Sequence, residues 1–303
     1  MNTSTDRRIA VIGLGAMGGA MAATLHKTGW AVTGFDPSEA ARAAASAAGI
    51  ATTASLEDVA GTPYAVLSLP AASIVEATVP QLLAKPGTVA IIDTTTSEPA
   101  TSKQMADLAE KQGAAFVDAP VSGGRDGAAA GSLSAFVGAT DAALQAAEPV
   151  LLALTGGKFS HIGGPGSGNV VKLLNNVLAA ANLVSVGEAL GVAKAYGIDP
   201  ATAAASISEA SGGSKVSANM YPNWVLTGTH DSGFSLGLMA RDAALAVDVA
   251  RQIGENPSLL GAVASQWQDA LAALGPRADF TEIARTVAPA ITPAGAPGTA
   301  AVA

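Results

Sequence analysis

The sequence predicts an α/β N-terminal domain with a doubly wound, mostly parallel sheet, and an all-α C-terminal domain that a long interdomain helix joins to it. Three observations support this. Short apolar runs alternate with alanine-rich helical stretches as far as Ile162, which is the pattern of a parallel sheet covered on both faces. A glycine-rich break follows at 163–168. From there to about Val287 the chain reads as helix.

The alternation sets the expected elements. Candidate strands are 8–12, 31–35, 64–69, 89–93 and 115–118, with 133–137 and 159–162 extending the sheet. Candidate helices of the second domain are 169–196, 200–209, 236–253, 258–274 and 281–287. We place the domains at 1–164 and 165–288. We expect the tail at 289–303 to be disordered, because it is rich in Pro, Gly and Ala and has no periodicity.

Composition limits the class of protein. The 303 residues are 49% hydrophobic and 13% charged, enough for two cores. A net charge of −8 without a dense Lys/Arg run argues against a nucleic acid partner. The absence of cysteine excludes disulfides and thiolate chemistry and, with no signal-peptide core, favours a cytoplasmic protein. The run 177–195 is very apolar, but Glu188 interrupts it, so we expect a buried helix and no membrane contact.

A glycine motif follows the first strand directly. In Gly13-x-Gly15-x-x-Gly18 the first glycine allows a tight turn, the second lets a pyrophosphate approach the backbone, and the third lets helix and strand pack closely. The helix N-terminus then faces the phosphates. Asp36 ends the second strand, where a carboxylate accepts the ribose hydroxyls of NAD and repels the 2′-phosphate of NADP. The alternative is a surface aspartate that begins an Asp-Pro turn.

Polar loops follow other strands of the same sheet. Leu69-Pro70 and the segment 93–97 come after two of them, so these loops should line the cofactor crevice. The segment Ser122-Gly123-Gly124 can turn its amides together to hold an anion, although a glycine-rich loop without a ligand is an equal alternative.

Lys172, Asn175 and Asn176 share one face of the long helix, at spacings of three and four residues. Polar groups on an otherwise apolar helix are costly to bury unless they are bonded, which favours a site. A solvated surface lysine is the alternative. His26, His161 and His230 have no metal-ligand spacing, and we expect no metal.

Four motifs together resemble those of the β-hydroxyacid dehydrogenases. They are Gly-Leu-Gly-Ala-Met-Gly at 13–18, Asp-Ala-Pro-Val-Ser-Gly-Gly at 118–124, Gly166-x-Gly168-x-x-x-Lys172-x-x-Asn175-Asn176, and Arg241-Asp242. The resemblance runs from about Arg8 to Val287. It implies a Rossmann domain, NAD as cofactor, a small anionic hydroxy acid as substrate, and a homodimer or homotetramer.

The resemblance also implies roles for single residues. Lys172 matches the catalytic lysine, which acts as general acid/base. The implied substrate contacts are Ser122, Gly123, Gly124, Asn176 and Arg241. The implied cofactor contacts are Gly13, Leu14, Gly15, Ala16, Met17, Gly18, Asp36, Leu69, Pro70, Thr96 and Arg241. Arg241 stands where the family has lysine; its planar, bidentate guanidinium keeps the charge and changes the shape.

These residues favour an NAD-dependent oxidoreductase of a short 3-hydroxy acid or its semialdehyde. The hydroxyl proton needs a base, and Lys172 supplies one if burial and the nearby Arg241 lower its pKa. Two alternatives stay open. An imine reductase of this architecture generally lacks such a lysine. A non-catalytic NAD-binding interaction protein would not need Lys172, Ser122 and Asn176. A 6-phosphogluconate dehydrogenase needs a longer helical domain. On family analogy, Arg125, 211–215 and Phe234 are further candidates for the substrate pocket.

Overall fold

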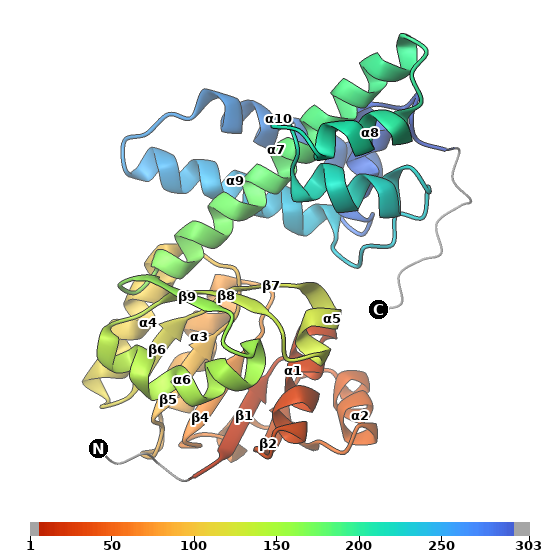
Figure 1. Ribbon diagram of the computed structural model, residues 1–303. Helices are drawn as coiled ribbons and strands as arrows, with labels where there is room; N and C mark the ends of the chain where they lie inside the picture. Colours follow the sequence, from red (N-terminus) through yellow and green to blue (C-terminus); the bar gives the residue numbers. More distant parts are fainter. Residues whose placement is uncertain (1–5, 294–303) are drawn as a thin grey trace. The chain divides into compact units, whose positions relative to one another are not determined.

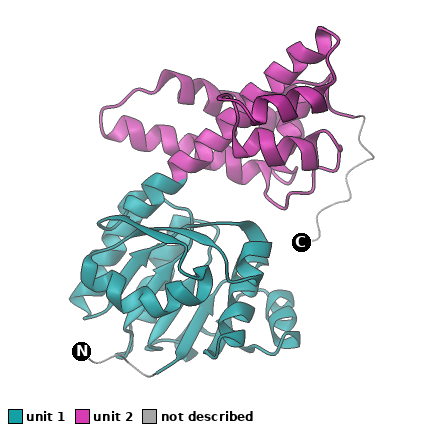
Figure 2. Ribbon diagram, viewed as in Figure 1, with its two compact units in different colours: residues 1–172 teal, residues 173–303 magenta. Residues whose placement is uncertain are grey.

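The computed structural model describes residues 6–293 (Figure 1). The chain divides into two units, one ending at Lys172 and one beginning at Leu173 (Figure 2). The division falls inside a helix, a little after the expected domain boundary at 164. The helix begins in the first unit because its first residues bond to the end of a sheet strand there.

A single sheet forms the centre of the first unit. Its strands are β1 (Arg8–Ile12), β2 (Ala31–Phe35), β3 (Ala51–Thr53), β4 (Tyr64–Leu67), β5 (Ala90–Asp93), β6 (Ala115–Asp118), β7 (Val121–Ser122), β8 (Ser134–Gly138) and β9 (Phe159–Gly163). Their order is β3-β2-β1-β4-β5-β6-β8-β7, and β9 pairs with β8. All pairs from β3 to β6 are parallel, and β6 is antiparallel to β8. The strand order reverses beside β1, which is where open α/β sheets bind ligands.

Helices cover both faces of this sheet (Figure 1). They are α1 (Ala16–Lys27), α2 (Glu39–Ala47), α3 (Ala72–Leu82), α4 (Pro99–Lys111), α5 (Gly124–Ala129) and α6 (Asp141–Thr155), with a 3-10 turn at Leu56–Asp58. Ile9 and Val11 pack in a core with α1 and α6, whereas Ala10 and Ile12 pack in a core with α3 and α4. Because neighbouring residues of a strand face opposite sides, one apolar strand serves two cores.

The regular elements of the second unit's described residues are helices, joined by turns and by one isolated β-bridge between Ser235 and Asp279. The long helix α7 (Ser167–Ala195) is followed by α8 (Pro200–Ser208), a π-helix at Val216–Val225, α9 (Leu236–Gln252), α10 (Ser258–Leu274), a 3-10 helix at Phe280–Ile283 and α11 (Ala284–Val287). Tyr221 and Trp267 are fully buried, and each donates a hydrogen bond to a main-chain oxygen of α7. A Cβ on Gly187 would lie 2.5 Å from the Tyr221 hydroxyl, so only glycine permits this approach.

Helix α7 is long and apolar enough to cross a membrane by length and composition, with a mean hydropathy of 1.4 over its best window. Half of that window is nevertheless buried inside the protein. Val177, Leu183 and Leu190 are fully buried core residues. A core helix of this kind passes the same test, so its hydropathy alone carries no membrane assignment.

The predicted fold class is confirmed: a doubly wound, mostly parallel sheet precedes a helical region. Two details differ from the expectation. The π-helix at Val216–Val225 was not predicted, because Gly212, Gly213 and Pro222 argue against a helix there. The predicted disordered tail begins with packed residues, since Ile291 is buried in the second unit's core. Its remaining part, 294–303, lies outside the described residues.

Asp93 is a buried carboxyl at the end of β5 and is fully inaccessible to solvent. Its Oδ1 accepts a hydrogen bond from the Thr95 amide at 3.0 Å, while Oδ2 has no partner. Burial raises the pKa of Asp93 to about 7. Below about pH 7 the folded protein therefore holds Asp93 mainly in the protonated form, because burial penalises the ionised carboxylate.

We expect the unfolding free energy of the Asp93→Asn variant to increase relative to that of the wild type as the pH rises. A carboxyl whose pKa is raised on folding loses stability between its unfolded value and its folded value, here from about pH 4 to about pH 7. The asparagine cannot ionise and keeps the acceptor for Thr95. Relative to wild type, the variant should gain about 2–3 kcal/mol of unfolding free energy between pH 5 and pH 8. Denaturant titrations at both pH values measure it. Asp107→Asn, an exposed carboxylate on α4, is the control. A pH-independent difference for Asp93→Asn would contradict the prediction.

Candidate active site

The parallel strands bring five loops to one edge of the sheet. Because β1, β2, β4, β5 and β6 all run in the same direction, the segments that follow them leave from the same edge. These segments hold the glycine motif, Asp36, the pair Leu69-Pro70, Thr96 and the loop at 119–124. The fold thus gathers at one edge the residues of the first unit that the sequence singles out.

The three glycines of the motif meet different surroundings. Gly13 has φ +91°, and a Cβ there would lie 2.2 Å from the Ser68 carbonyl oxygen. A Cβ on Gly18 would lie 1.8 Å from the Gly13 carbonyl oxygen. Gly15, in contrast, has no atom within 4 Å of its Cβ position, and it precedes α1 without a side-chain cap. Two glycines are thus needed for packing, while the third leaves room for a ligand at uncapped amides, which fits a dinucleotide pyrophosphate.

Asp36 lies against this glycine loop. Its Oδ2 accepts a hydrogen bond from the Leu14 amide, and its Oδ1 accepts one from the Ser38 amide, both at 2.8 Å. The aspartate therefore begins a turn, as one alternative from the sequence has it, and its carboxylate is also bonded to the glycine loop. Arg42 donates to the Asp36 main-chain oxygen at 2.7 Å, which places a cation beside the same carboxylate-bearing residue.

The loop after β5 is held by its own hydroxyl groups. Thr94 donates to the Leu67 carbonyl at 2.7 Å, and the Thr95 hydroxyl accepts from the Leu69 amide at 3.1 Å. Both threonines are buried, and Thr96 is half-buried between them and the buried Ser97. The loops after β4 and β5 are therefore tied to each other, which fixes the positions of Leu69 and Thr96.

The segment after β6 makes the predicted glycine turn. Gly123 has φ +128° and Gly124 has φ +62°, values that favour glycine at both positions. Both residues are exposed, and Gly124 is the first residue of α5. An amide at that position has no carbonyl one turn earlier within its own helix. The local geometry suits an anion and does not by itself identify one.

Two glycines of the third motif let α7 approach the sheet. A Cβ on Gly166 would lie 2.7 Å from the Pro99 carbonyl oxygen, and one on Gly168 would lie 2.3 Å from the Phe136 carbonyl oxygen. The Asp118 carboxylate accepts the Gly166 amide at 2.7 Å and the Asn169 amide at 2.9 Å. Burial raises the pKa of Asp118 to about 6, although these amide bonds act in the opposite direction.

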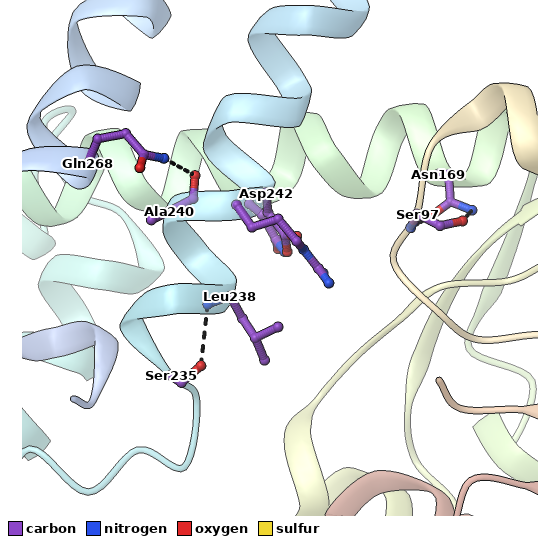
Figure 3. Close-up of polar contacts among 9 residues, drawn as sticks. Ser97, Asn169, Ser235, Leu238, Ala240, Asp242 and Gln268 are labelled. Carbon is purple, nitrogen blue, oxygen red and sulfur yellow. Dashed lines mark hydrogen bonds and ion pairs between the residues drawn. The ribbon is translucent and has the colours of Figure 1, made fainter. Parts of the chain in front are cut away.

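Asn169 continues the same network. Its Oδ1 accepts the Ser97 amide at 3.0 Å, and its Nδ2 donates to the Ser102 hydroxyl at 3.0 Å (Figure 3 shows Ser97 and Asn169). Asn169 is fully buried. One residue of α7 thus joins the loop after β5 to α4, next to the point where Asp118 holds the helix start.

Lys172 lies one turn further along α7 and is only 9% exposed. That burial does not fit the solvated surface lysine that the sequence alone allows. Asn176, one turn later, is 6% exposed, whereas Asn175 is exposed. The predicted polar face of the helix therefore has two buried members, Lys172 and Asn176.

In the second unit, Asn176 belongs to a chain of polar side chains. Its Nδ2 donates to Asp242 Oδ2 at 2.7 Å, and its Oδ1 accepts from Asn175 Nδ2 at 3.2 Å. Arg241 donates to Asp242 Oδ1 from Nη2 at 2.7 Å and from Nε at 3.0 Å (Figure 3 labels Asp242 on α9). Asp242 is almost fully buried and is paired on both oxygens. The positive charge of Arg241 is therefore paired with the negative charge of Asp242. The sequence analysis treated Arg241 as a cation near Lys172 and did not consider this partner.

Sequence reasoning missed Asp118, Asn169 and Asp242 as polar anchors. Asp118 and Asp242 stood inside the quoted motifs, but their buried partners are separated in sequence by 48 to 66 residues. No local pattern reveals such pairings. In residues 6–293 no group of three or more His, Asp or Glu side chains could hold a metal ion.

Two family models match the chain. Residues 8–163 match the NAD binding domain of 6-phosphogluconate dehydrogenase, and residues 166–287 match the NAD-binding domain of NADP-dependent 3-hydroxyisobutyrate dehydrogenase. Among the curated relatives, 2-(hydroxymethyl)glutarate dehydrogenase of Eubacterium barkeri is 36% identical over 274 residues, which is 88% of this chain and 90% of that protein.

Solved structures agree with these matches. The 3-hydroxyisobutyrate dehydrogenase of Mycobacterium tuberculosis, solved with L-serine, has a TM-score of 0.85 and 32% identity over 93% of this chain and 99% of that one. An imine reductase of Streptomyces aurantiacus has a TM-score of 0.62 and 23% identity over 92% of this chain and 99% of that one, a likeness of fold alone. With the glycine loop, these matches show that the chain belongs to the β-hydroxyacid dehydrogenase family of oxidoreductases and carries that family's NAD(P)-binding domain.

Proposed function

We propose that this protein is an NAD-dependent dehydrogenase of short 3-hydroxy acids, or equally a reductase of their semialdehydes. The observation that carries the proposal is the burial of Lys172 on helix α7. This helix starts at the end of β6, on the edge of the sheet that also holds the glycine motif. Related proteins whose names specify hydroxy acids support the substrate class. The sequence does not set the physiological direction.

Lys172 is proposed to act as the general acid/base that accepts and returns the proton of the substrate hydroxyl group. A bound nicotinamide would supply the acceptor for the hydride that leaves the hydroxyl-bearing carbon. The neutral amine of Lys172 takes the hydroxyl proton as the carbonyl forms, and in the reverse direction its ammonium polarises the carbonyl and returns the proton.

The remaining predicted residues would orient the two ligands. Gly15 and the α1 amides would hold the pyrophosphate, and Asp36 the adenosine ribose. The Ser122-Gly123-Gly124 segment would bind the substrate carboxylate, and Asn176 its hydroxyl. Arg241 keeps its place in both sets of contacts, with its guanidinium oriented by Asp242. The homodimer or homotetramer that the resemblance implies, and a cytoplasmic location, stay predictions.

A panel of small hydroxy acids with NAD, followed by NADH absorbance, tests the function. Each active acid should be compared with its neutral amide, because a carboxylate site built from amide donors leaves those donors unpaired when the charge is absent. We expect the acid to have a kcat/KM at least about 100-fold higher than its amide. Equal rates would contradict the carboxylate site. Reduction of a cyclic imine without turnover of any acid would favour the imine reductase alternative.

Replacing the proposed acid/base should separate chemistry from binding. We expect Lys172→Ala to lower kcat by about 100-fold or more while the Kd for NAD changes little. Steady-state rate assays give kcat, and titration with NAD followed by fluorescence gives the Kd. Lys194→Ala is the matched control, because Lys194 lies exposed in the last turn of the same helix. Turnover within twofold of wild type in Lys172→Ala would refute the assigned role.

We expect Asp36 to select NAD over NADP. In a variant without this carboxylate, Arg42 could bind the 2′-phosphate of NADP. We expect wild type to prefer NAD over NADP by at least about tenfold, roughly 1.4 kcal/mol. Asp36→Ser should narrow or reverse this preference, because it removes the repulsive charge and leaves the Arg42 cation beside the loop. The double variant Asp36→Ser/Arg42→Ala should lose the improved use of NADP that Asp36→Ser alone provides. Kinetics with both cofactors decide it; an unchanged preference in Asp36→Ser would show that the carboxylate does not discriminate.

A further inference from the structure

The start of α7 is bonded both to the end of strand β6 and to the loop that follows β5. The Asp118 carboxylate, at the end of β6, accepts amides from Gly166 and Asn169. The Asn169 side chain accepts the Ser97 amide from the loop after β5. Asp118 and Asn169 are both fully buried, and neither is needed to contact a ligand in the function proposed above.

Asp118 is fitted closely into this position. A Cβ added to Gly138 would lie 2.5 Å from Asp118 Oδ1, and one added to Gly168 would lie 2.8 Å from Asp118 Oδ2. The carboxylate therefore has glycines on two sides and amide donors on both oxygens. Asparagine at this position would offer one acceptor and would turn an NH2 group against an amide donor.

Asn169 is matched to its partners in the same way. It uses its oxygen for the Ser97 amide and its nitrogen for the Ser102 hydroxyl at the start of α4. The loop that carries Thr96 and the helix that carries Lys172 thus share one buried side chain. An Asn169→Ala change would leave the Ser97 amide without its acceptor inside the protein.

An α-helix rises about 1.5 Å per residue, so Lys172 lies only about 4–5 Å along the axis from Asn169. The first turn therefore sets the direction and depth of the helix segment that carries the lysine. Thr96 immediately precedes Ser97, whose amide Asn169 accepts, and Ser122 lies four residues after Asp118.

We propose that Asp118 and Asn169 are positioning residues of the reaction, which lock the first turn of α7 to the ends of β5 and β6 and so fix Lys172 relative to the cofactor and substrate loops. This rests on the proposed function. Misplacement of a reacting group by about 1 Å can cost on the order of 100-fold in rate, so the anchors should govern turnover. An ordinary helix cap would instead change stability alone.

The test compares Asp118→Asn and Asn169→Ala with Thr140→Ala. Thr140 caps α6 in the same unit by accepting the Ala143 amide, so its loss removes a helix cap away from α7. We expect both anchor variants to lower kcat by about tenfold to 100-fold at a temperature where circular dichroism shows them folded. KM for NAD should stay within about threefold, and Thr140→Ala should keep the wild-type kcat.

A second readout needs no turnover. The rate at which an amine-reactive ester acylates Lys172, followed by mass spectrometry, should rise at least about threefold in the anchor variants, because the lysine loses its fixed, buried position. Exposed Lys194 on the same helix is the internal reference. If the wild type turned over no hydroxy acid, the proposed function would fail, and the labelling rates would still decide the positioning role.

Three results would overturn the proposal. They are folded anchor variants with kcat within twofold of wild type, a loss of kcat that Thr140→Ala reproduces, and a Lys172 labelling rate that does not change. If Asp118→Asn fails to fold, Asn169→Ala decides by the same measures, because it removes the link to Ser97 while leaving the Asp118 carboxylate bonded to both amides.

Discussion

The buried carboxylate of Asp118 is the interaction on which the candidate site depends most. It ends a central strand, accepts two amides from the start of α7, and lies five residues before Gly123, the first glycine of the turn at 123–124. Burial of a carboxyl group is costly unless its oxygens are bonded, and here the amides of a helix start provide those bonds. The helix that carries Lys172 therefore has a defined beginning on the sheet.

The same edge of the sheet also explains the glycine motif. Gly13 and Gly18 are required because backbone oxygens lie where a Cβ would be, whereas Gly15 borders open space. Close packing and ligand access are thus assigned to different glycines of one short segment. The Asp36 carboxylate accepts amides from Leu14 of this segment and from Ser38, so its position is fixed by the protein itself.

In the second unit, the buried carboxylate of Asp242 is bonded to the side chains of Arg241 and Asn176. Arg241 and Asp242 are neighbours in sequence on α9. Two nitrogens of Arg241 donate to one carboxylate oxygen of Asp242, Oδ1, while Asn176 donates to the other, Oδ2. A guanidinium suits this geometry because it carries several N–H donors in one plane, so two of its nitrogens can donate to the same oxygen. A lysine ammonium has a single nitrogen and could not make this contact from two nitrogens.

The amino-acid sequence by itself determined the fold class, because hydrophobic periodicity and glycine punctuation are local signals. It also supplied the glycine motif, Asp36 and the Lys172 helix face, since each depends on spacing within a short segment. Only the tertiary structure revealed that Asp118, Asn169 and Asp242 bond to partners far away in the chain. It also showed the π-helix at Val216–Val225, whose glycine and proline signals oppose helix formation. Such features depend on which buried donors and acceptors meet after folding, and nothing in a local pattern records that pairing.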